Sequence, residues 1–310
     1  MKQRHVLSVM DLGADEFAER CRRAIELKSE RTDKQTLRGR VVGIHFRKTS
    51  TRTRSAFMVG AGRLGATTIY YGPNDLQTNT GESIEDTARV LAGYLDVLVM
   101  RTSDSLEEMQ TFAAHPMSVV NALGGEEHPT QAVTDLTTIL EHFGRLDGID
   151  MLYMGEGNRT AASLALAFGR IHGGRLTLAT PPGYGLDPAI LARARQLAVT
   201  HGAVVEEQHS TSSLPVGVDV VYTSRWQEMG ITKPDPDWRR VFMPFRVSEK
   251  VMVQVSKPNG TVLMHDLPAV RGEDVDDAVL DGPQSIAWTQ AQNKLFGAMS
   301  VLEWVGAGVH

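Results

Sequence analysis

The sequence predicts an α/β protein with two doubly wound parallel sheets. Short, largely apolar runs such as 96–101 and 150–155 alternate with segments of helical periodicity, and this alternation occurs in two stretches of the chain. Continuously apolar strands are typical of parallel sheets that helices cover on both faces. A chain of 310 residues is also long enough to form two hydrophobic cores. We therefore expect two α/β domains that meet near residues 144–148.

In the first stretch, each expected strand is followed by turn residues or by a helical pattern. The expected strands cover 41–46, 67–71, 96–101 and 117–121, and the expected helices cover 51–64, 83–94 and 105–114. Val133, Leu136, Leu140 and Phe143 recur at steps of three, four and three, which marks the apolar face of a further helix. Pro129 suits the first turn of that helix.

The second stretch repeats this pattern. The expected strands cover 150–155, 175–179, 203–206, 218–223 and 261–265, and the expected helices cover 159–171, 188–199 and 284–305. In open α/β sheets, ligands bind beyond the carboxyl ends of the strands. We therefore expect the functional residues to lie in the loops that follow the strands.

Composition excludes several classes of protein. Lys and Arg total 32 and Asp and Glu total 37, so the net charge is −5, and no basic tract marks a nucleic-acid-binding surface. Cys21 is the only cysteine, which excludes an intramolecular disulfide and fits a reducing compartment. The histidines lack metal-ligand spacing, and no apolar run reaches the roughly 18 residues of a membrane span. We expect a cytoplasmic protein without metal, nucleic-acid or membrane partners.

The loop after strand 41–46 carries the densest set of hydrogen-bond donors. Ser50 is expected to cap the following helix, and 51–53 would present backbone N–H groups at its N-terminus, where a phosphate binds well. Arg52 and Arg54 add charged donors. The alternative is an ordinary capped helix with surface arginines.

Three further motifs lie at strand ends or at a helix start. His128 and Gln131 are three residues apart at a helix start, so they can face one ligand. Arg101 ends a strand, and Pro268 follows another strand within a turn that could be cis and could aim backbone carbonyls at a ligand. Each has an ordinary alternative: a hydrogen-bonded loop histidine, a surface arginine and a plain turn.

Taken in this order and separation, the Ser-Thr-Arg-Thr-Arg, His-Pro-Thr-Gln and His-x-Leu-Pro motifs resemble the aspartate/ornithine carbamoyltransferase family. The resemblance covers essentially the whole chain and includes 72–77, 82–91 and 290–294. Lys48 and Gln77 make the N-terminal half more similar to the ornithine branch.

The resemblance implies a fold, an activity and an assembly. Residues 1–143 plus 288–310 would form the carbamoyl-phosphate-binding domain, with the final helix packing back on it, and 144–287 the amino-acid domain. The activity would be transfer of the carbamoyl group of carbamoyl phosphate to the amino group of an ornithine-like amino acid, with release of phosphate and without a cofactor. The assembly would be a homotrimer with shared active sites.

The resemblance also assigns the residues that bind carbamoyl phosphate. Ser50, Thr51, Arg52 and Thr53 would bind the phosphate, while Arg101, His128 and Thr53 would hold the carbonyl oxygen. The NH₂ group would contact Gln131 and the carbonyl of Leu267. Gln77 would lie near the phosphate, on a loop that could reach a neighbouring subunit, and Lys294 stands where the ornithine branch has an Arg. Arg52, Arg101 and His128 are the expected catalytic residues.

The amino-acid half departs from the ornithine branch. Ser224 and Asp266 stand where that branch has Asp and Cys, whereas Arg225, Gln227 and the Arg159-Thr160 pair match the aspartate branch. The residues expected to bind the amino acid are Arg159, Ser224, Arg225, Gln227, Met229 and Asp266. Two added cations and one relocated anion favour an acceptor that has both a carboxylate and an ammonium group. Alternatively, Arg225 pairs internally with Glu228 or Asp266.

Other functions remain open at this point. The acceptor could be aspartate-like or another specialised amino acid, and the chain could be a non-catalytic relative that binds a metabolite. A dinucleotide oxidoreductase is disfavoured because Gly155-x-Gly157 lacks the third glycine, which is replaced by Thr160, and no acid ends the next strand. Glu85, Glu107 and Glu108 are expected on solvated helix faces.

Overall fold

A computed structural model describes residues 3–30, 35–102, 105–227 and 232–308. The chain divides into two compact units: unit 1 comprises Met1–Thr137 and Gln292–His310, and unit 2 comprises Thr138–Ala291. The domain boundaries expected at 143/144 and 287/288 stay predictions. Among the described residues, no helix is both long enough and apolar enough to cross a membrane.

Unit 1 contains a parallel four-stranded sheet in the order β2-β1-β3-β4. The strands are β1 (Val41–Phe46), β2 (Thr67–Tyr71), β3 (Val97–Arg101) and β4 (Ser118–Asn121). The helices are α1 (Ala14–Ser29), α2 (Arg52–Arg63), α3 (Ile84–Ala92), α4 (Leu106–Ala113) and most of α11 (Ala287–Gly306).

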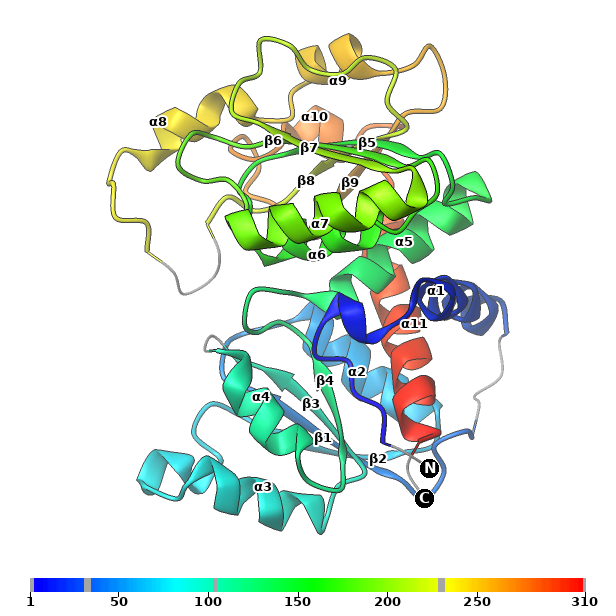
Figure 1. Ribbon diagram of the computed structural model, residues 1–310, viewed down its shortest axis with the longest axis vertical. Coiled ribbons are helices and arrows are strands. Elements are labelled where there is room, and N and C mark those ends of the chain that lie inside the picture. Colours follow the sequence, from blue (N-terminus) through cyan, green and yellow to red (C-terminus); the bar gives the residue numbers. More distant parts are fainter. Residues whose placement is uncertain (1–2, 31–34, 103–104, 228–231, 309–310) are drawn as a thin grey trace. The chain divides into compact units, whose positions relative to one another are not determined.

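Helices cover both faces of this sheet (Figure 1). On one face, α3 and α4 enclose a core that includes Leu98 and Met100 of β3. On the other face, α2 packs on α11 so closely that a Cβ added at Gly60 would lie 3.0 Å from Met299 Cγ. The final helix therefore packs back on the first unit, as predicted.

Unit 2 contains a parallel five-stranded sheet in the order β7-β6-β5-β8-β9. The strands are β5 (Asp150–Met154), β6 (Arg175–Ala179), β7 (Val204–Gln208), β8 (Val220–Thr223) and β9 (Val262–His265). Helices α6 (Arg159–Phe168) and α7 (Pro188–His201) lie on one face, and α9 (Glu249–Val255) and α10 (Asp277–Leu280) lie on the other (Figure 1). The predicted class, two doubly wound parallel sheets, is confirmed.

Several boundaries and elements differ from the sequence prediction. Helix α11 begins at Ala287 rather than 284, because Gln284 and Ile286 form backbone hydrogen bonds with Leu263 of β9 at 2.8 and 2.9 Å. Helix α6 ends at Phe168, before Gly169, rather than at 171. The prediction missed several elements: α1, α8 (Trp238–Phe242), α9, α10, η1 (Val9–Asp11), η2 (Gln77–Thr80) and η3 (Met243–Phe245).

Both sheets have a point where the strand order reverses. In unit 1, β1 and β3 are neighbours, and the chain continues outward from them to β2 on one side and to β4 on the other. In unit 2, β5 and β8 have the same relation, with β6 and β9 outside them. Ligands of doubly wound sheets bind beyond the carboxyl ends of the strands at such points. The loops after β1, β3, β5 and β8 are therefore the places to look for chemistry.

His45, in the middle of the unit 1 sheet, makes stability depend on pH. Burial, reinforced by the positive charge of Arg47, lowers the pKa of His45 to about 4, whereas an unfolded histidine titrates near 6.5. Because the unfolded chain binds more protons between these values, the free energy of unfolding falls as the pH drops through this window. Urea unfolding should show His45 contributing about 2 kcal/mol to the loss between about pH 7 and about pH 5. His45→Gln should reduce the pH dependence by that amount, and an unchanged dependence would contradict this assignment.

Candidate active site

At the reversal point of unit 1, the loop after β1 lies beside the end of β3. Phe46 pairs with Arg101 in register, and the backbone N–H of Arg47 donates to the Arg101 carbonyl at 3.0 Å. Arg101 is only 6% exposed although it ends a strand, so it is not the surface arginine of the ordinary alternative.

The loop between β1 and α2 differs from the prediction in its helix cap. Helix α2 begins at Arg52, and Thr51, not Ser50, occupies the N-cap position, with helical backbone angles and no side-chain cap hydrogen bond. An N-terminal turn that is not capped by its own side chain keeps backbone donors for an anion. Ser50 and Thr53 are buried, and Arg52 is partly buried.

A lysine from the far end of the chain joins this loop. Lys294 of α11 is buried, and its Nζ donates to Thr53 Oγ1 at 3.4 Å. The packing of α11 on α2 thus brings a second cation to the start of α2.

The loop from β4 to α5 (Pro129–Phe143) carries His128 and is joined to β3. The backbone N–H of Thr102, next to Arg101, donates to the Leu123 carbonyl at 3.1 Å. His128 is buried, and its Nδ1 lies 3.4 Å from Thr130 Oγ1. Strand pairing therefore places the backbones of Arg101 and of the loop leading to His128 at one edge of the sheet.

Gln131 presents a buried acceptor. Its Nε2 donates to Asp135 Oδ1 at 2.7 Å, which fixes the amide orientation because a carboxylate only accepts. Its Oε1 has no hydrogen-bond partner among the described residues, although the side chain is only 1% exposed. A buried carbonyl oxygen in this state suits a ligand that carries an N–H group.

Other charged or polar groups near these motifs are used differently. Gln77 is exposed on η2, after edge strand β2, and its Oε1 accepts from Thr80 at 2.6 Å. Arg54 donates to the Tyr70 hydroxyl at 3.2 Å and stacks on its ring. Glu108 was expected on a solvated face, but it is buried and pairs with Arg47 at 2.6 Å. That expectation was wrong because the Arg47 cation lies next to α4.

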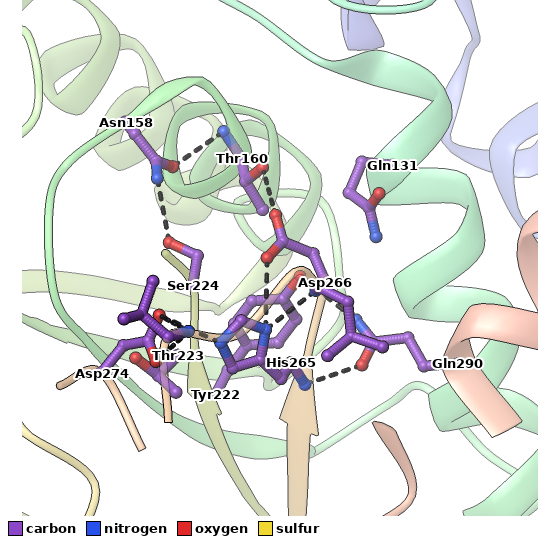
Figure 2. Close-up of polar contacts among 12 residues, drawn as sticks. Gln131, Asn158, Thr160, Tyr222, Thr223, Ser224, His265, Asp266, Asp274 and Gln290 are labelled. Atoms are coloured by element: carbon purple, nitrogen blue, oxygen red, sulfur yellow. Dashed lines mark hydrogen bonds and ion pairs between the residues drawn. The ribbon is translucent and has the colours of Figure 1, made fainter. Parts of the chain in front are cut away.

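In unit 2, a directional chain of hydrogen bonds joins Tyr153 of β5 to the loops after β5 and β8. Figure 2 shows the contact between Asn158 and Ser224. Asn158 caps α6 with Oδ1, so its Nδ2 is the group that donates to Ser224 Oγ at 2.9 Å. The Tyr153 hydroxyl donates to the Glu156 carbonyl at 2.7 Å, so Ser224 must donate to Tyr153 across their 2.6 Å contact. Ser224 is fully buried, and its hydroxyl proton is donated to Tyr153 within the protein.

The two glycines of the loop after β5 serve packing and conformation. Gly155 has φ of +134°, which disfavours a side chain. A Cβ at Gly157 would lie 2.3 Å from two backbone atoms, Gly185 C and Leu186 N. This requirement gives the Gly-x-Gly pattern a physical reason that involves no dinucleotide.

Asp266, directly after β9, is held by two neighbours. Its Oδ2 accepts from Thr160 Oγ1 at 3.0 Å, and its Oδ1 lies 3.6 Å from His265 Nδ1 (Figure 2). The peptide bond between Leu267 and Pro268 is cis, and Leu267 has φ of +54°.

His265 stabilises the turn that contains Asp266 and Leu267. It is fully buried, and its Nδ1 accepts from the Leu267 backbone N–H at 2.8 Å. The backbone N–H of His265 donates to Gln290 Oε1 at 2.8 Å, and Gln290 Nε2 donates to the Tyr222 hydroxyl at 3.2 Å (Figure 2). Asp274 Oδ2 lies 3.5 Å from His265 Nε2. These contacts fix the backbone that carries Asp266.

The remaining residues predicted to bind the amino acid are partly exposed. Arg159 begins α6, and Arg225 and Gln227 follow β8. Between described residues, Arg225 forms no ion pair with Asp266. Met229 and Glu228 lie outside the described residues.

Sequence reasoning missed several residues that build the site. Asn158 immediately precedes a helix, so a cap could have been predicted from its position. Asp135 lies four residues after Gln131 on the same helix, so their contact could also have been predicted from spacing. Tyr153 offers no such signal, because its partners Glu156 and Ser224 lie outside its own strand.

Comparison of the sequence with models of known protein families identifies the family of this chain. The model of the carbamoyl-phosphate-binding domain of aspartate/ornithine carbamoyltransferases matches residues 4–141, and the model of their aspartate/ornithine-binding domain matches residues 147–305. The chain belongs to the aspartate/ornithine carbamoyltransferase family. The predicted family, enzyme class and reaction type are confirmed: the chain is a carbamoyltransferase.

Individual relatives are named for the ornithine branch. Ornithine carbamoyltransferase of Thermococcus kodakarensis is 39% identical over 89% of this chain and 86% of its own length. That of Methanothermobacter thermautotrophicus is 36% identical over 97% of this chain and 98% of its own. The solved structure of the Pyrococcus furiosus enzyme superimposes with a TM-score of 0.93 at 35% identity, covering 99% of this chain and 98% of that one.

Proposed function

We propose that unit 1 binds carbamoyl phosphate and that the carbamoyl group passes to the amino group of an amino acid held by unit 2. The buried Oε1 of Gln131 carries the donor assignment, because it is an acceptor in need of an N–H and the carbamoyl NH₂ supplies one. Ser50, Thr51, Arg52 and Thr53 bind the phosphate, and Lys294 adds positive charge.

The chemistry requires charge stabilisation and no covalent protein intermediate. A neutral amine attacks the carbamoyl carbon to form the new N–C bond, and negative charge builds on the carbonyl oxygen. The carbon–oxygen bond to phosphate then breaks, and the phosphate leaves with that electron pair and takes up the proton that the amine releases. Arg101 and His128 donate to the carbonyl oxygen, and Arg52 stabilises the leaving phosphate. Donors that are already buried, as Arg101 and His128 are, exchange little water during the reaction.

The acceptor assignment rests on the charges around β8 and β9. Ser224 is neutral and its proton is used by Tyr153, so it cannot replace the carboxylate that the ornithine branch has there. Asp266 supplies a carboxylate directly after β9, on a turn fixed by His265. Arg159 and Arg225 supply positive charge for a carboxylate. We infer an acceptor with both a carboxylate and an ammonium group, different from simple ornithine.

A panel of amines tests this acceptor assignment. Phosphate release at saturating carbamoyl phosphate should be measured with ornithine, aspartate and a series of diamino and dicarboxylic acids. We expect an amino acid other than ornithine to give the highest kcat/KM. Turnover of ornithine far above every other amine would contradict the altered acceptor and leave the donor assignment standing.

Arg225→Ala is expected to change acceptor preference. If Arg225 binds the acceptor carboxylate, its loss should raise the KM for the preferred acceptor about tenfold or more. The KM for carbamoyl phosphate should stay within about twofold, because Arg225 belongs to unit 2. The same kinetic assay reports both constants. An unchanged ranking of acceptors would favour internal pairing of Arg225 instead.

We also propose a homotrimer with shared active sites and a cytoplasmic location. Unit 1 exposes large apolar side chains on α2, on edge strand β2, on α3 and in the turn after α3, namely Met58, Val59, Ile69, Ile84, Val90 and Tyr94. Exposed apolar surface on one unit favours contact with further copies. Exposed Gln77 follows the same edge strand, which suits a residue donated to a neighbour. Light scattering coupled to gel filtration should give three times the monomer mass, and a monomer would contradict the proposal.

A further inference from the structure

Unit 2 contains a buried ammonium group that the reaction described above does not use. Lys233 Nζ lies 4.7 Å from the ring centroid of Tyr184, 4.8 Å from that of Phe242 and 5.2 Å from that of Trp238. Its side chain is only 5% exposed, and it forms an ion pair with Glu156. We call these four partners, Tyr184, Glu156, Trp238 and Phe242, the Lys233 cage.

The cage combines the two interactions that a desolvated ammonium group needs. Three aromatic rings within about 6 Å attract the cation through their electron-rich faces, and this attraction grows when water is excluded. The Glu156 carboxylate balances the charge, which would otherwise be costly to bury. An interaction of this kind holds its partners in a defined arrangement.

The partners come from three separate segments. Glu156 belongs to the loop after β5, Tyr184 to the loop after β6, and Trp238 and Phe242 to α8. The backbone contributes as well, since the Gly157 N–H donates to the Tyr184 carbonyl at 2.8 Å. One side chain thus joins three parts of unit 2 that the sheet alone does not connect.

Two of these contacts lead to the proposed acceptor residues. The Glu156 carbonyl accepts from Tyr153, which in turn accepts from Ser224. The loop continues from Glu156 to Asn158, the N-cap of α6, and Arg159 is the first residue of that helix. On the other side, the Phe242 ring lies 5.4 Å from that of Trp226. Trp226 is 1% exposed and lies between Arg225 and Gln227 in the sequence. Its packing therefore fixes the backbone from which the side chains of Arg225 and Gln227 extend.

We infer that Lys233 is a positioning residue for the acceptor. Its ammonium group clamps the loop that carries Asn158 and Arg159 to the aromatic cluster that seats Trp226. Removing the charge leaves the carbamoyl-phosphate residues of unit 1 unchanged and loosens the residues of unit 2 that meet the amino acid. This inference rests on the proposed function in naming the ligand, but the clamp itself is a property of unit 2.

Lys233→Met tests the clamp, because methionine keeps most of the volume and removes the charge. We expect the KM for the preferred amino acid to rise about tenfold, while the KM for carbamoyl phosphate changes less than about twofold. Lys233→Arg, which retains a cation for Glu156 and the rings, should recover part of the loss. Lys250→Met, an exposed lysine of the same unit, should match the parent enzyme in both constants.

Two kinetic results would overturn the inference. One is a Lys233→Met enzyme that melts at a lower temperature but keeps both KM values. The other is an equal rise in the two KM values, which would point to a general loss of structure. Should Lys233→Met fail to fold, Glu156→Gln provides the same comparison from the partner side, and an unchanged acceptor KM in that variant would be equally decisive against it.

Hydrogen exchange separates this inference from the proposed function. If no amine is turned over by the parent enzyme, the proposed function fails, yet the clamp can still be measured without substrates. Peptides covering 155–159 should exchange faster in Lys233→Met than in the parent chain and in Lys250→Met. Equal exchange in the three proteins would show that Lys233 does not hold this loop.

Discussion

Arg52→Ala is expected to abolish carbamoyl transfer with every acceptor. Arg52 begins α2, where the uncapped first turn and the Lys294–Thr53 contact gather positive charge for a phosphate. Losing a charged donor to the leaving group should lower kcat/KM about a thousandfold, or about 4 kcal/mol of transition-state stabilisation. The assay is phosphate release, measured with each amine of the panel.

Arg54→Ala is the matched control for this prediction. Arg54 lies two residues further along α2 and carries the same charge, but its guanidinium contacts the Tyr70 hydroxyl and ring instead. Its loss should reduce kcat/KM by less than about tenfold. Equal effects of the two substitutions would mean that the phosphate is stabilised by the overall positive charge of this region and not by a hydrogen-bond donor at a specific position.

Gly157→Ala is expected to disrupt the acceptor side of unit 2. A Cβ at this position would lie 2.3 Å from backbone atoms of Gly185 and Leu186, and backbone cannot yield as a side-chain tip can. The loop after β5 must then separate from the loop that supplies Tyr184 to the Lys233 cage. We expect a loss of about 3 kcal/mol in the free energy of unfolding, with a raised acceptor KM in any folded enzyme.

A second glycine provides the comparison. Gly62 lies within α2, and a Cβ added there would meet no atom within 4 Å. Gly62→Ala should therefore stabilise the chain by about 0.5–1 kcal/mol, as alanine does inside helices. Chemical denaturation of both variants gives the two values. If Gly157→Ala proved as stable as the parent chain, the close contact between the two loops would be refuted.

The sheets could be predicted because each strand is a short apolar run with its own turn signals. The expected strand 41–46 coincides with β1, and 67–71 with β2. The start of α11 could not be predicted from helical periodicity, because residues 284–286 pair with β9, which lies about twenty residues earlier in the chain. A local pattern carries no information about such a pairing.

The same distinction holds for the site residues: those in a contiguous motif could be predicted, and those whose partners lie on other elements could not. Ser50, Thr51, Arg52 and Thr53 form a contiguous motif, so their closeness at the start of α2 is visible in the sequence. The cap was misjudged because the loop geometry, which places Thr51 at the N-cap, outweighs the usual preference for a serine cap. Glu108 was misjudged because its partner Arg47 lies on another element. Lys233 was overlooked for the same reason, since its cage is assembled from three distant segments.

The most direct test of donor and acceptor roles is the stoichiometry of the products. The purified chain should be incubated with carbamoyl phosphate and its preferred amino acid, and phosphate and the N-carbamoyl amino acid should be quantified together by colorimetry and mass spectrometry. We predict one N-carbamoyl amino acid for each phosphate released, and neither product above background with Arg52→Ala. Phosphate formed without a carbamoylated amine, or no enzyme-dependent product with any amine, would show that unit 1 does not prepare a carbamoyl group for transfer.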